Sequence, residues 1–262
     1  MRFENYLLVT DVDGTLADGQ YINEHNIEAL KRFMSDGGRF AIATGRSPQS
    51  AVPIAKRIGG DSLMIANNGT LVYDYLNDNI IWQQELKCTD AVIKILEQYP
   101  TSGAMFYCGR EIQVVRNSPQ LTRLIEAEDL QTTSDPKNMI NKVIFAAESE
   151  IIDEIDAFCK AELTDINGRV VRSDDTYIEI LPKTADKGIA MVKLSERIGI
   201  PREKIFAVGN YYNDVTMLDF ATISGVPEES PEEVKEHADY IACDCRSGTV
   251  ADFVYFLYAT VK

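Results

Sequence analysis

Acidic and amide side chains gather in short polar turns, each of which follows an apolar run. Asp11 and Asp13 follow the run 7–9, and the turn 210–214 follows the run 205–208. The side chains of two aspartates that lie two residues apart at a strand end point to the same face of the sheet, where their carboxylates repel each other. A bound cation usually offsets this repulsion. Mg²⁺ takes carboxylate and amide oxygens and shares its shell with phosphate oxygens and water. The alternative is an ordinary Asp-Gly turn. The metal ligands predicted on this basis are Asp11, Asp13, Asn210 and Asp214.

Two further polar turns follow apolar runs. Thr44, Gly45 and Arg46 come after residues 40–43, and Asn68-Gly69 come after residues 63–65. In an open parallel sheet, ligands bind outside the carboxyl ends of the strands, so these turns are expected to meet at one site. Arg46 is predicted to contact the substrate or the inserted domain, or else to form a salt bridge with a carboxylate. Asn68 and Gly69 either shape the floor of the site or form an ordinary turn.

Lys187 occupies a position that local structure does not favour. Asp186 is the predicted cap of a helix over 187–198, which places Lys187 in the first turn, where a cation opposes the helix dipole. A residue that breaks a local rule is a candidate for function. Without its neighbours, Lys187 would be interpreted as a solvated surface lysine.

The elements that must position these residues alternate between strand and helix in residues 1–83 and again in 186–262. Continuous apolar strands with amphipathic helices between them predict an α/β domain whose parallel sheet is covered on both faces. Residues 84–185 differ, because strands there form neighbouring pairs with helices between them, which predicts an inserted α+β domain. Hinges are expected near 82–87 and 182–186. Candidate specificity residues on the inserted domain are Tyr107, Arg110, Arg116 and Arg172.

The chain resembles the haloacid dehalogenase superfamily and, within it, the Cof-like phosphatases. The resemblance is carried by five motifs in the family's order, D-V-D-G-T-L at 11–16, A-T-G-R at 43–46, N-N-G at 67–69, D-K-G at 186–188 and G-N-Y-Y-N-D at 209–214. It implies a Rossmann-like core, an inserted cap domain and Mg²⁺-dependent hydrolysis of phosphate monoesters.

The resemblance also implies a role for each matching residue. Asp11 would be the nucleophile that forms an aspartyl phosphate, and Asp13 would be the general acid and then the general base. Mg²⁺ would be held by the Asp11 carboxylate, the Asp13 backbone carbonyl and the turn that contains Asn210 and Asp214. The phosphate-binding residues would be Thr44, Gly45, Arg46, Lys187 and Asn213.

One position departs from the family pattern. Asn210 stands where the family usually has an aspartate, so a neutral oxygen replaces a charged one and metal affinity is expected to fall. Asp214 could compensate. The departure keeps a second possibility open, a weakly active phospho-ligand-binding regulatory protein. A third is a phosphomutase or phosphotransferase that uses the same nucleophile.

Composition limits the class of partner. The chain has 262 residues with 26 Lys and Arg against 41 Asp and Glu, a formal net charge of −15. Such a charge repels nucleic acid and anionic membranes, so neither is expected as a partner. The five cysteines are too few for a disulfide scaffold, and no apolar run is long enough for a membrane span. These features predict a cytoplasmic protein. The family resemblance implies that its partner is a small phosphorylated metabolite, and a monomer or small homo-oligomer is expected.

Overall fold

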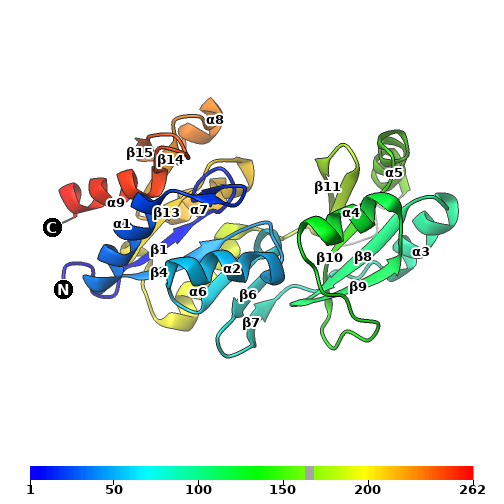
Figure 1. The fold of residues 1–262 in the computed structure, drawn as a ribbon, viewed down its shortest axis with the longest axis horizontal. Helices are drawn as coiled ribbons and strands as arrows, with labels where there is room; N and C mark the ends of the chain where they lie inside the picture. The colour runs from blue at the N-terminus through cyan, green and yellow to red at the C-terminus, as the bar shows by residue number, and fades with distance from the viewer. Residues whose placement is uncertain (163–167, 262) are drawn as a thin grey trace. The chain divides into compact units, whose positions relative to one another are not determined.

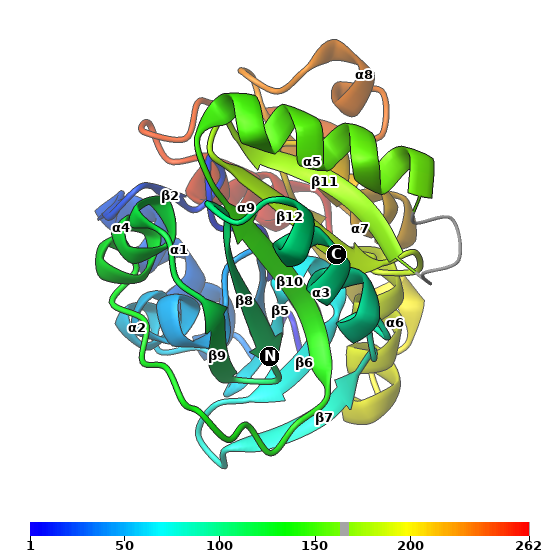
Figure 2. The same cartoon turned by 90° about the vertical axis from the view of Figure 1, so that its right-hand side faces the viewer.

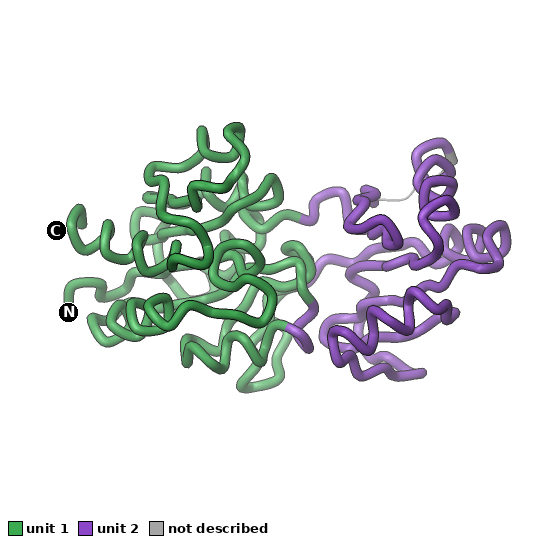
Figure 3. The backbone as a smooth tube through the Cα atoms, turned by 45° about the horizontal axis from the view of Figure 1, so that its top comes forward, with its two compact units in different colours: residues 1–46, 51–82, 186–262 green, residues 47–50, 83–185 purple. Residues whose placement is uncertain are grey.

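The computed structural model describes residues 1–162 and 168–261, and the chain divides into two compact units. The first unit comprises residues 1–46, 51–82 and 186–262, and the second comprises 47–50 and 83–185 (Figure 3). In the described residues no helix is long and apolar enough to cross a membrane.

The first unit is built on one eight-stranded sheet (Figure 1). Its strands are β1 (Leu7–Thr10), β4 (Arg39–Ala43), β5 (Leu63–Ala66), β6 (Leu71–Asp74), β7 (Asn79–Gln83), β13 (Ile205–Val208), β14 (Ile223–Pro227) and β15 (Tyr240–Ala242). They lie in the order β15-β14-β13-β1-β4-β5-β6-β7. The six strands from β15 to β5 are parallel, and β6 pairs antiparallel with β5. A small hairpin, β2 (Ala17–Asp18) with β3 (Tyr21–Ile22), follows β1.

The helices of this unit are α1 (Glu24–Ser35), α2 (Pro48–Ile58), α6 (Lys187–Ile198), α7 (Val215–Phe220), α8 (Glu232–Lys235) and α9 (Thr249–Thr260). Alternate residues of β1 enter two different apolar clusters. Leu8 packs with residues of α1, α2 and α9, whereas Leu7 and Val9 pack with residues of α6 and α7. Both faces of the parallel sheet are therefore buried, which explains the continuous apolar character of its strands.

In its described residues, the second unit has a five-stranded antiparallel sheet and three helices (Figure 2). Its strands are β8 (Gly103–Cys108), β9 (Glu111–Arg116), β10 (Ile140–Ala146), β11 (Gly168–Asp174) and β12 (Tyr177–Pro182), in the order β11-β12-β10-β8-β9. Helices α3 (Thr89–Gln98) and α5 (Ser149–Glu162) pack in one apolar cluster of the unit, and α4 (Pro119–Ala127) packs in another. The predicted α/β class, with a parallel core sheet and a separate α+β module, is confirmed.

Short elements were harder to predict than long ones. The helix starts at Asp186-Lys187 and Ser47-Pro48 agree with the sequence, because a capping side chain or a proline marks each one. Neither β6 nor β7 was predicted, and both extend the core sheet beyond β5.

Candidate active site

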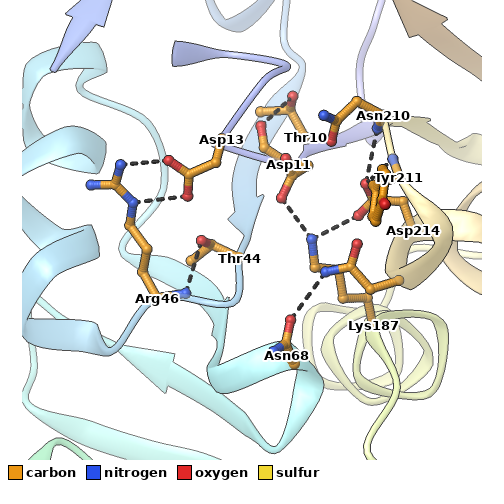
Figure 4. A network of polar contacts seen from close by, with 11 residues as sticks. Thr10, Asp11, Asp13, Thr44, Arg46, Asn68, Lys187, Asn210, Tyr211 and Asp214 are labelled. Atoms are coloured by element: carbon orange, nitrogen blue, oxygen red, sulfur yellow. Dashed lines mark hydrogen bonds and ion pairs between the residues drawn. The ribbon is translucent and has the colours of Figure 1, made fainter. Parts of the chain in front are cut away.

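Three buried ionic side chains from distant parts of the chain form one cluster. The Lys187 Nζ donates to Asp11 Oδ1 at 2.6 Å and to Asp214 Oδ1 at 2.7 Å. Asp11 follows β1, Lys187 opens α6, and Asp214 ends the 3₁₀ turn Tyr212–Asp214 after β13. All three side chains are at least nine-tenths buried. Figure 4 shows the Lys187 amine between the two carboxylates. The structure brings together Asp11 and Asp214, from the turns after β1 and β13, as the strand-end argument predicts, and it places Lys187 from the start of α6 between them.

Burial and mutual attraction set the charges of this cluster. Burial raises the pKa of Asp11 to about 7, while the Lys187 ammonium acts to lower it and the Asp214 carboxylate to raise it. Burial alone would lower the pKa of Lys187, but Asp11 and Asp214 outweigh it and leave that pKa above its ordinary value. Lys187 therefore keeps its proton, and the cluster holds a fixed positive charge beside the Asp11 carboxylate.

The position of Lys187 depends on close backbone packing around the first turn of α6. The Asp186 side chain accepts from the Ile189 N–H at 2.9 Å and so caps the helix, as predicted. Gly69 has a φ of +86°, and a Cβ there would lie 2.2 Å from the Asp186 carbonyl oxygen. A Cβ at Gly188 would lie 2.5 Å from the Thr216 carbonyl oxygen. These two glycines allow the helix start to lie against neighbouring backbone and hold Lys187 between the carboxylates.

Asp13 pairs with a different cation. Its two carboxylate oxygens accept from Arg46 Nη2 at 2.5 Å and Nε at 2.9 Å, and its side chain is about half exposed. The Thr44 hydroxyl oxygen accepts from the Arg46 N–H at 3.1 Å, so the side chain of Thr44 fixes the turn that carries Arg46. The two neighbouring aspartates are thus each balanced by a basic side chain. Arg46 was predicted either to contact the substrate or the inserted domain, or to form a salt bridge with a carboxylate. The structure shows the salt bridge, with Asp13 as the partner.

The N-N-G turn lies against the late site loop. Asn213 Nδ2 donates to Asn68 Oδ1 at 3.1 Å, which joins the turns after β5 and β13. A Cβ at Gly45 would lie 2.9 Å from that same Asn68 oxygen. Glycine at 45 therefore lets Asn68 approach the A-T-G-R turn. Asn68 and Gly69 therefore contact the loop after β13 and the first turn of α6, and a role at the floor of the site stays a prediction.

The loop after β13 is organised around Asp214. Its Oδ2 accepts from the backbone N–H groups of Asn210 at 2.9 Å and Tyr211 at 3.1 Å, while its Oδ1 accepts from Lys187. Both of its oxygens are thus already engaged, so its place in a metal shell stays a prediction. The Asn210 amide lies against the first site turn, because a Cβ at Gly14 would be 2.3 Å from Asn210 Nδ2.

The site also contains polar side chains that the sequence reasoning did not single out. Both side-chain heteroatoms of Asn67 and the hydroxyl of Thr15 are buried without a hydrogen-bond partner in the described chain. Both residues lie within the motifs 67–69 and 11–16, directly beside residues that were chosen. For Asn67, the available signal was a polar residue directly after an apolar strand, but its neighbours Asn68 and Gly69 were chosen instead.

The predicted specificity residues of the second unit have structural contacts there. The Arg116 guanidinium donates to the carbonyls of Leu96, Tyr99 and Ser102 at 2.5–2.7 Å and so holds the end of α3. Arg172 donates to Asp153 on α5 and to the Asp175 carbonyl. Tyr107 is buried under the Lys142 amine, whose Nζ lies 4.9 Å from the ring centroid.

The backbone carbonyl of the remaining residue of that set, Arg110, accepts from Gln49 Nε2 at 3.0 Å, and Arg110 has a further interaction. None of these contacts assigns a substrate-binding role to any of the four residues.

The model of the haloacid dehalogenase-like hydrolases matches residues 8–254, so the chain belongs to this family. The predicted family and class of enzyme, a haloacid dehalogenase-type hydrolase of phosphate esters, are confirmed.

Curated relatives match along nearly the whole chain. A 5-amino-6-(5-phospho-D-ribitylamino)uracil phosphatase of Bacillus subtilis is 25% identical over 97% of this chain and 98% of its own length. A pyridoxal phosphate phosphatase of Escherichia coli is 24% identical over 95% of this chain and 97% of its own.

Solved structures show the same fold. A haloacid dehalogenase-like hydrolase from Bacteroides thetaiotaomicron superposes with a TM-score of 0.84 at 23% identity, covering 96% of this chain and 99% of that one. A sugar phosphatase of haloacid dehalogenase subclass IIB gives a TM-score of 0.76 at 19% identity, covering 97% and 99%.

Proposed function

We propose that this hydrolase is a Mg²⁺-dependent phosphatase of small phosphate monoesters that works through an aspartyl phosphate on Asp11. The single observation that carries the proposal is the buried cluster in which Lys187 contacts Asp11 at 2.6 Å and Asp214 at 2.7 Å. A carboxylate beside a fixed cation is suited to receive a phosphoryl group, because the cation balances the charge of the incoming oxygens.

In the first step, an oxygen of Asp11 attacks the phosphorus atom in line with the departing alcohol oxygen. The P–O bond to the alcohol breaks as the bond to the carboxylate forms, and Asp13 gives its proton to the leaving oxygen. Lys187 and Thr44 would hold the transferred phosphoryl oxygens, and Gly45, Arg46 and Asn213 are proposed to shape the rest of the phosphate pocket. The half-exposed position of Asp13 supports its role, because a proton donor must reach the substrate.

In the second step, water attacks the phosphorus atom of the aspartyl phosphate. Asp13, now ionised, takes a proton from that water, and inorganic phosphate and the free Asp11 carboxylate are formed. Dividing the hydrolysis in this way replaces one difficult displacement with two easier ones. Lys187 remains charged throughout and stabilises both transition states.

The donors fit a divalent cation. Asp11 Oδ2 is buried and has no hydrogen-bond partner in the described chain, which leaves one carboxylate oxygen for a metal. Asp11, the backbone carbonyl of Asp13 and the Asn210 amide would hold Mg²⁺, with Asp214 beside them. Bound Mg²⁺ would supply charge neutralisation at the phosphoryl group. The described residues hold no group of three or more Asp, Glu, His and Cys side chains placed to bind a metal, so neutral oxygens and water would complete the shell.

The leaving group is proposed to be small. By their names, the relatives described above act on 5-amino-6-(5-phospho-D-ribitylamino)uracil and on pyridoxal phosphate. We propose a substrate of that size, a sugar phosphate or a comparable ester. Residues 84–185 would form the cap that selects its leaving group, inserted into a core of residues 1–83 and 186–262.

A phosphatase screen with a series of small phosphate esters tests the proposal. Release of inorganic phosphate by the wild-type protein in millimolar Mg²⁺, and its loss in Asp11→Asn, is the expected result. Phosphate appearing on a sugar hydroxyl would identify a phosphomutase or phosphotransferase. Binding of esters with no turnover at any Mg²⁺ concentration would identify a phospho-ligand-binding protein, the alternative that Asn210 keeps open.

A further inference from the structure

One edge strand of the first unit carries no charge that would keep another chain from pairing with it. β7 is the last strand of the eight-stranded sheet, and among the described residues no strand pairs with its outer edge (Figure 1). Its five residues, Asn79-Ile80-Ile81-Trp82-Gln83, include no charged residue and no proline, in a chain in which 26% of the residues are charged. A strand edge of this kind offers backbone N–H and C=O groups to a strand that approaches it.

The other ends of the two large sheets carry features that block such pairing. β15, at the opposite end of the same sheet, has only three residues. In the second unit, β11 carries charged side chains, and its register shifts between Arg172 and Asp174. β9 begins at Glu111 and ends at Arg116, and Thr132 forms a bridge to it. Short length, charge, irregular register and covering all hinder edge pairing. β7 is longer than β15 and has none of the charges of β9 and β11.

A groove beside β7 adds side chains to this edge. It has a volume of about 350 Å³ and is lined by Ile81 and Trp82 of β7 and by Lys193, Glu196 and Arg197 of α6. Ile81 and Trp82 pack against the apolar cluster of α6 and α7 and are only partly buried. Glu196 and Arg197 are exposed neighbours of opposite charge, and the Lys193 Nζ donates to Glu196 Oε2 at 3.0 Å. An uncharged strand thus lies beside an apolar hollow that carries both cations and an anion.

We propose that β7 and this groove form the interface of a homodimer, in which β7 pairs antiparallel with β7 of a second copy. A strand that pairs antiparallel with its own copy satisfies twofold symmetry, because the same surface serves both partners. Trp82 supplies the kind of aromatic anchor that is enriched at protein interfaces.

Charge favours a second copy as the occupant of this surface. With a net charge of −15, most of the surface of one copy repels another. The groove is an exception, because two cations and one anion line it. The opposite charges of Glu196 and Arg197 allow reciprocal pairing across the twofold axis, in which Glu196 of each copy faces Arg197 of the other.

Molecular mass and tryptophan fluorescence, measured over one concentration series, test the interface. Trp82 is the single tryptophan of the chain, so its emission reports on the groove. Sedimentation equilibrium of the wild-type protein should show monomer and dimer in equilibrium. Over the concentrations at which the mass doubles, Trp82 emission should move to shorter wavelength and acrylamide should quench it less. A dimer that leaves Trp82 emission and quenching unchanged overturns the proposal. A chain that stays monomeric also overturns it and leaves the edge to a partner of another sequence.

Exchange of the two exposed charges tests the twofold contact without disturbing the core. Glu196→Arg and Arg197→Glu each place like charges opposite one another and should raise the dissociation constant of the dimer by about 10-fold or more. The double variant E196R/R197E restores opposite charges and should return this constant to within about threefold of the wild-type value. Lys56→Glu makes the same change in net charge as Arg197→Glu at an exposed position of α2 and should leave the constant unchanged. An equal loss in Lys56→Glu, or no recovery in the double variant, contradicts the reciprocal contact.

A charge on the strand itself separates β7 pairing from a contact between helices alone. Asn79 is exposed, and Asn79→Lys gives β7 the kind of charge that protects natural edges. Its dissociation constant should rise by about 10-fold or more, whereas the uncharged control Asn79→Ser should keep the wild-type value. A dimer that Asn79→Lys leaves intact refutes the pairing of β7. None of these measurements requires turnover, so their outcome is independent of the proposed phosphatase function.

Discussion

Replacing Lys187 with methionine removes the cation that lies between two buried carboxylates. The lysine side chain is 1% exposed, and its Nζ lies 2.6 Å from Asp11 and 2.7 Å from Asp214. Methionine has a similar length and fills the same space, so the change tests charge more than packing. Two buried carboxylates would then face each other without compensation in the metal-free protein. We therefore expect Lys187→Met to be strongly destabilised.

The expected size follows from the burial of the cluster. Removing one partner of a buried ion pair costs about 3–5 kcal/mol of unfolding free energy. For a protein of this length each kcal/mol shifts the melting temperature by roughly 2–4 °C, so the fall should be about 6–20 °C. An exposed lysine in the same unit, Lys56, provides the control, and Lys56→Met should stay within about 0.5 kcal/mol of the wild-type protein.

The assay is thermal unfolding in EDTA, followed by fluorescence of the single tryptophan. Trp82 packs against the apolar cluster of α6 and α7, so it reports on the first unit. The pH dependence gives a second readout. The folded-state pKa of Asp11 is about 7 and its ordinary value is 3.8, and loss of Lys187 raises it further. A raised pKa contributes stability at low pH that is lost as pH rises through the folded-state pKa. The loss of unfolding free energy in Lys187→Met, relative to the wild-type protein, should therefore be larger at pH 8 than at pH 5.

If the unfolding free energy of Lys187→Met at pH 8 lies within about 1 kcal/mol of the wild-type value, the reasoning is refuted. A loss of that size is what removal of an exposed ion pair produces. It would mean that the three side chains do not form a buried ionic cluster.

Three other changes have defined outcomes. Asn210→Asp should lower the Mg²⁺ concentration needed for half-maximal rate, because a charged oxygen replaces a neutral one. If a Mg²⁺ titration shows the same requirement as for the wild-type protein, residue 210 lies outside the metal shell. Asp13→Asn should lower kcat by about 10²–10⁴-fold with little change in melting temperature, and a kcat near that of the wild-type protein would exclude Asp13 as the proton donor. Gly69→Ala should lower the unfolding free energy, measured by urea denaturation, by about 2–5 kcal/mol. The new Cβ would sit on a residue with left-handed φ and would collide with the Asp186 carbonyl oxygen. Gly59→Ala, also at positive φ but with no atom within 4 Å, should cost only about 1–2 kcal/mol; equal losses would contradict the packing argument.

The chemical identity of the site could be predicted because its residues break local rules. Lys187 stands where a helix disfavours a cation, Asp11 directly follows an apolar strand, and Asp214 lies in the polar turn after another. Their convergence follows from the topology of a parallel sheet, in which strand ends distant in sequence meet at one edge.

Pairing between individual side chains could not be predicted in the same way. The contact between Asp13 and Arg46 and the engagement of both Asp214 oxygens depend on loop conformations that residue type does not determine. The extension of the sheet by β6 and β7 was missed because short strands carry little periodicity. Exposure of Tyr211 and Tyr212 likewise appears only in the folded chain, since aromatic residues are more often interpreted as core.

The most direct test of the catalytic account is to trap the phosphoryl group on the protein. The wild-type enzyme is mixed with an isotopically labelled phosphate ester, quenched in acid within one turnover and cleaved into peptides. The account predicts label on the peptide that contains Asp11 and none in Asp11→Asn. Label on another residue, or continued turnover by Asp11→Asn, would contradict it.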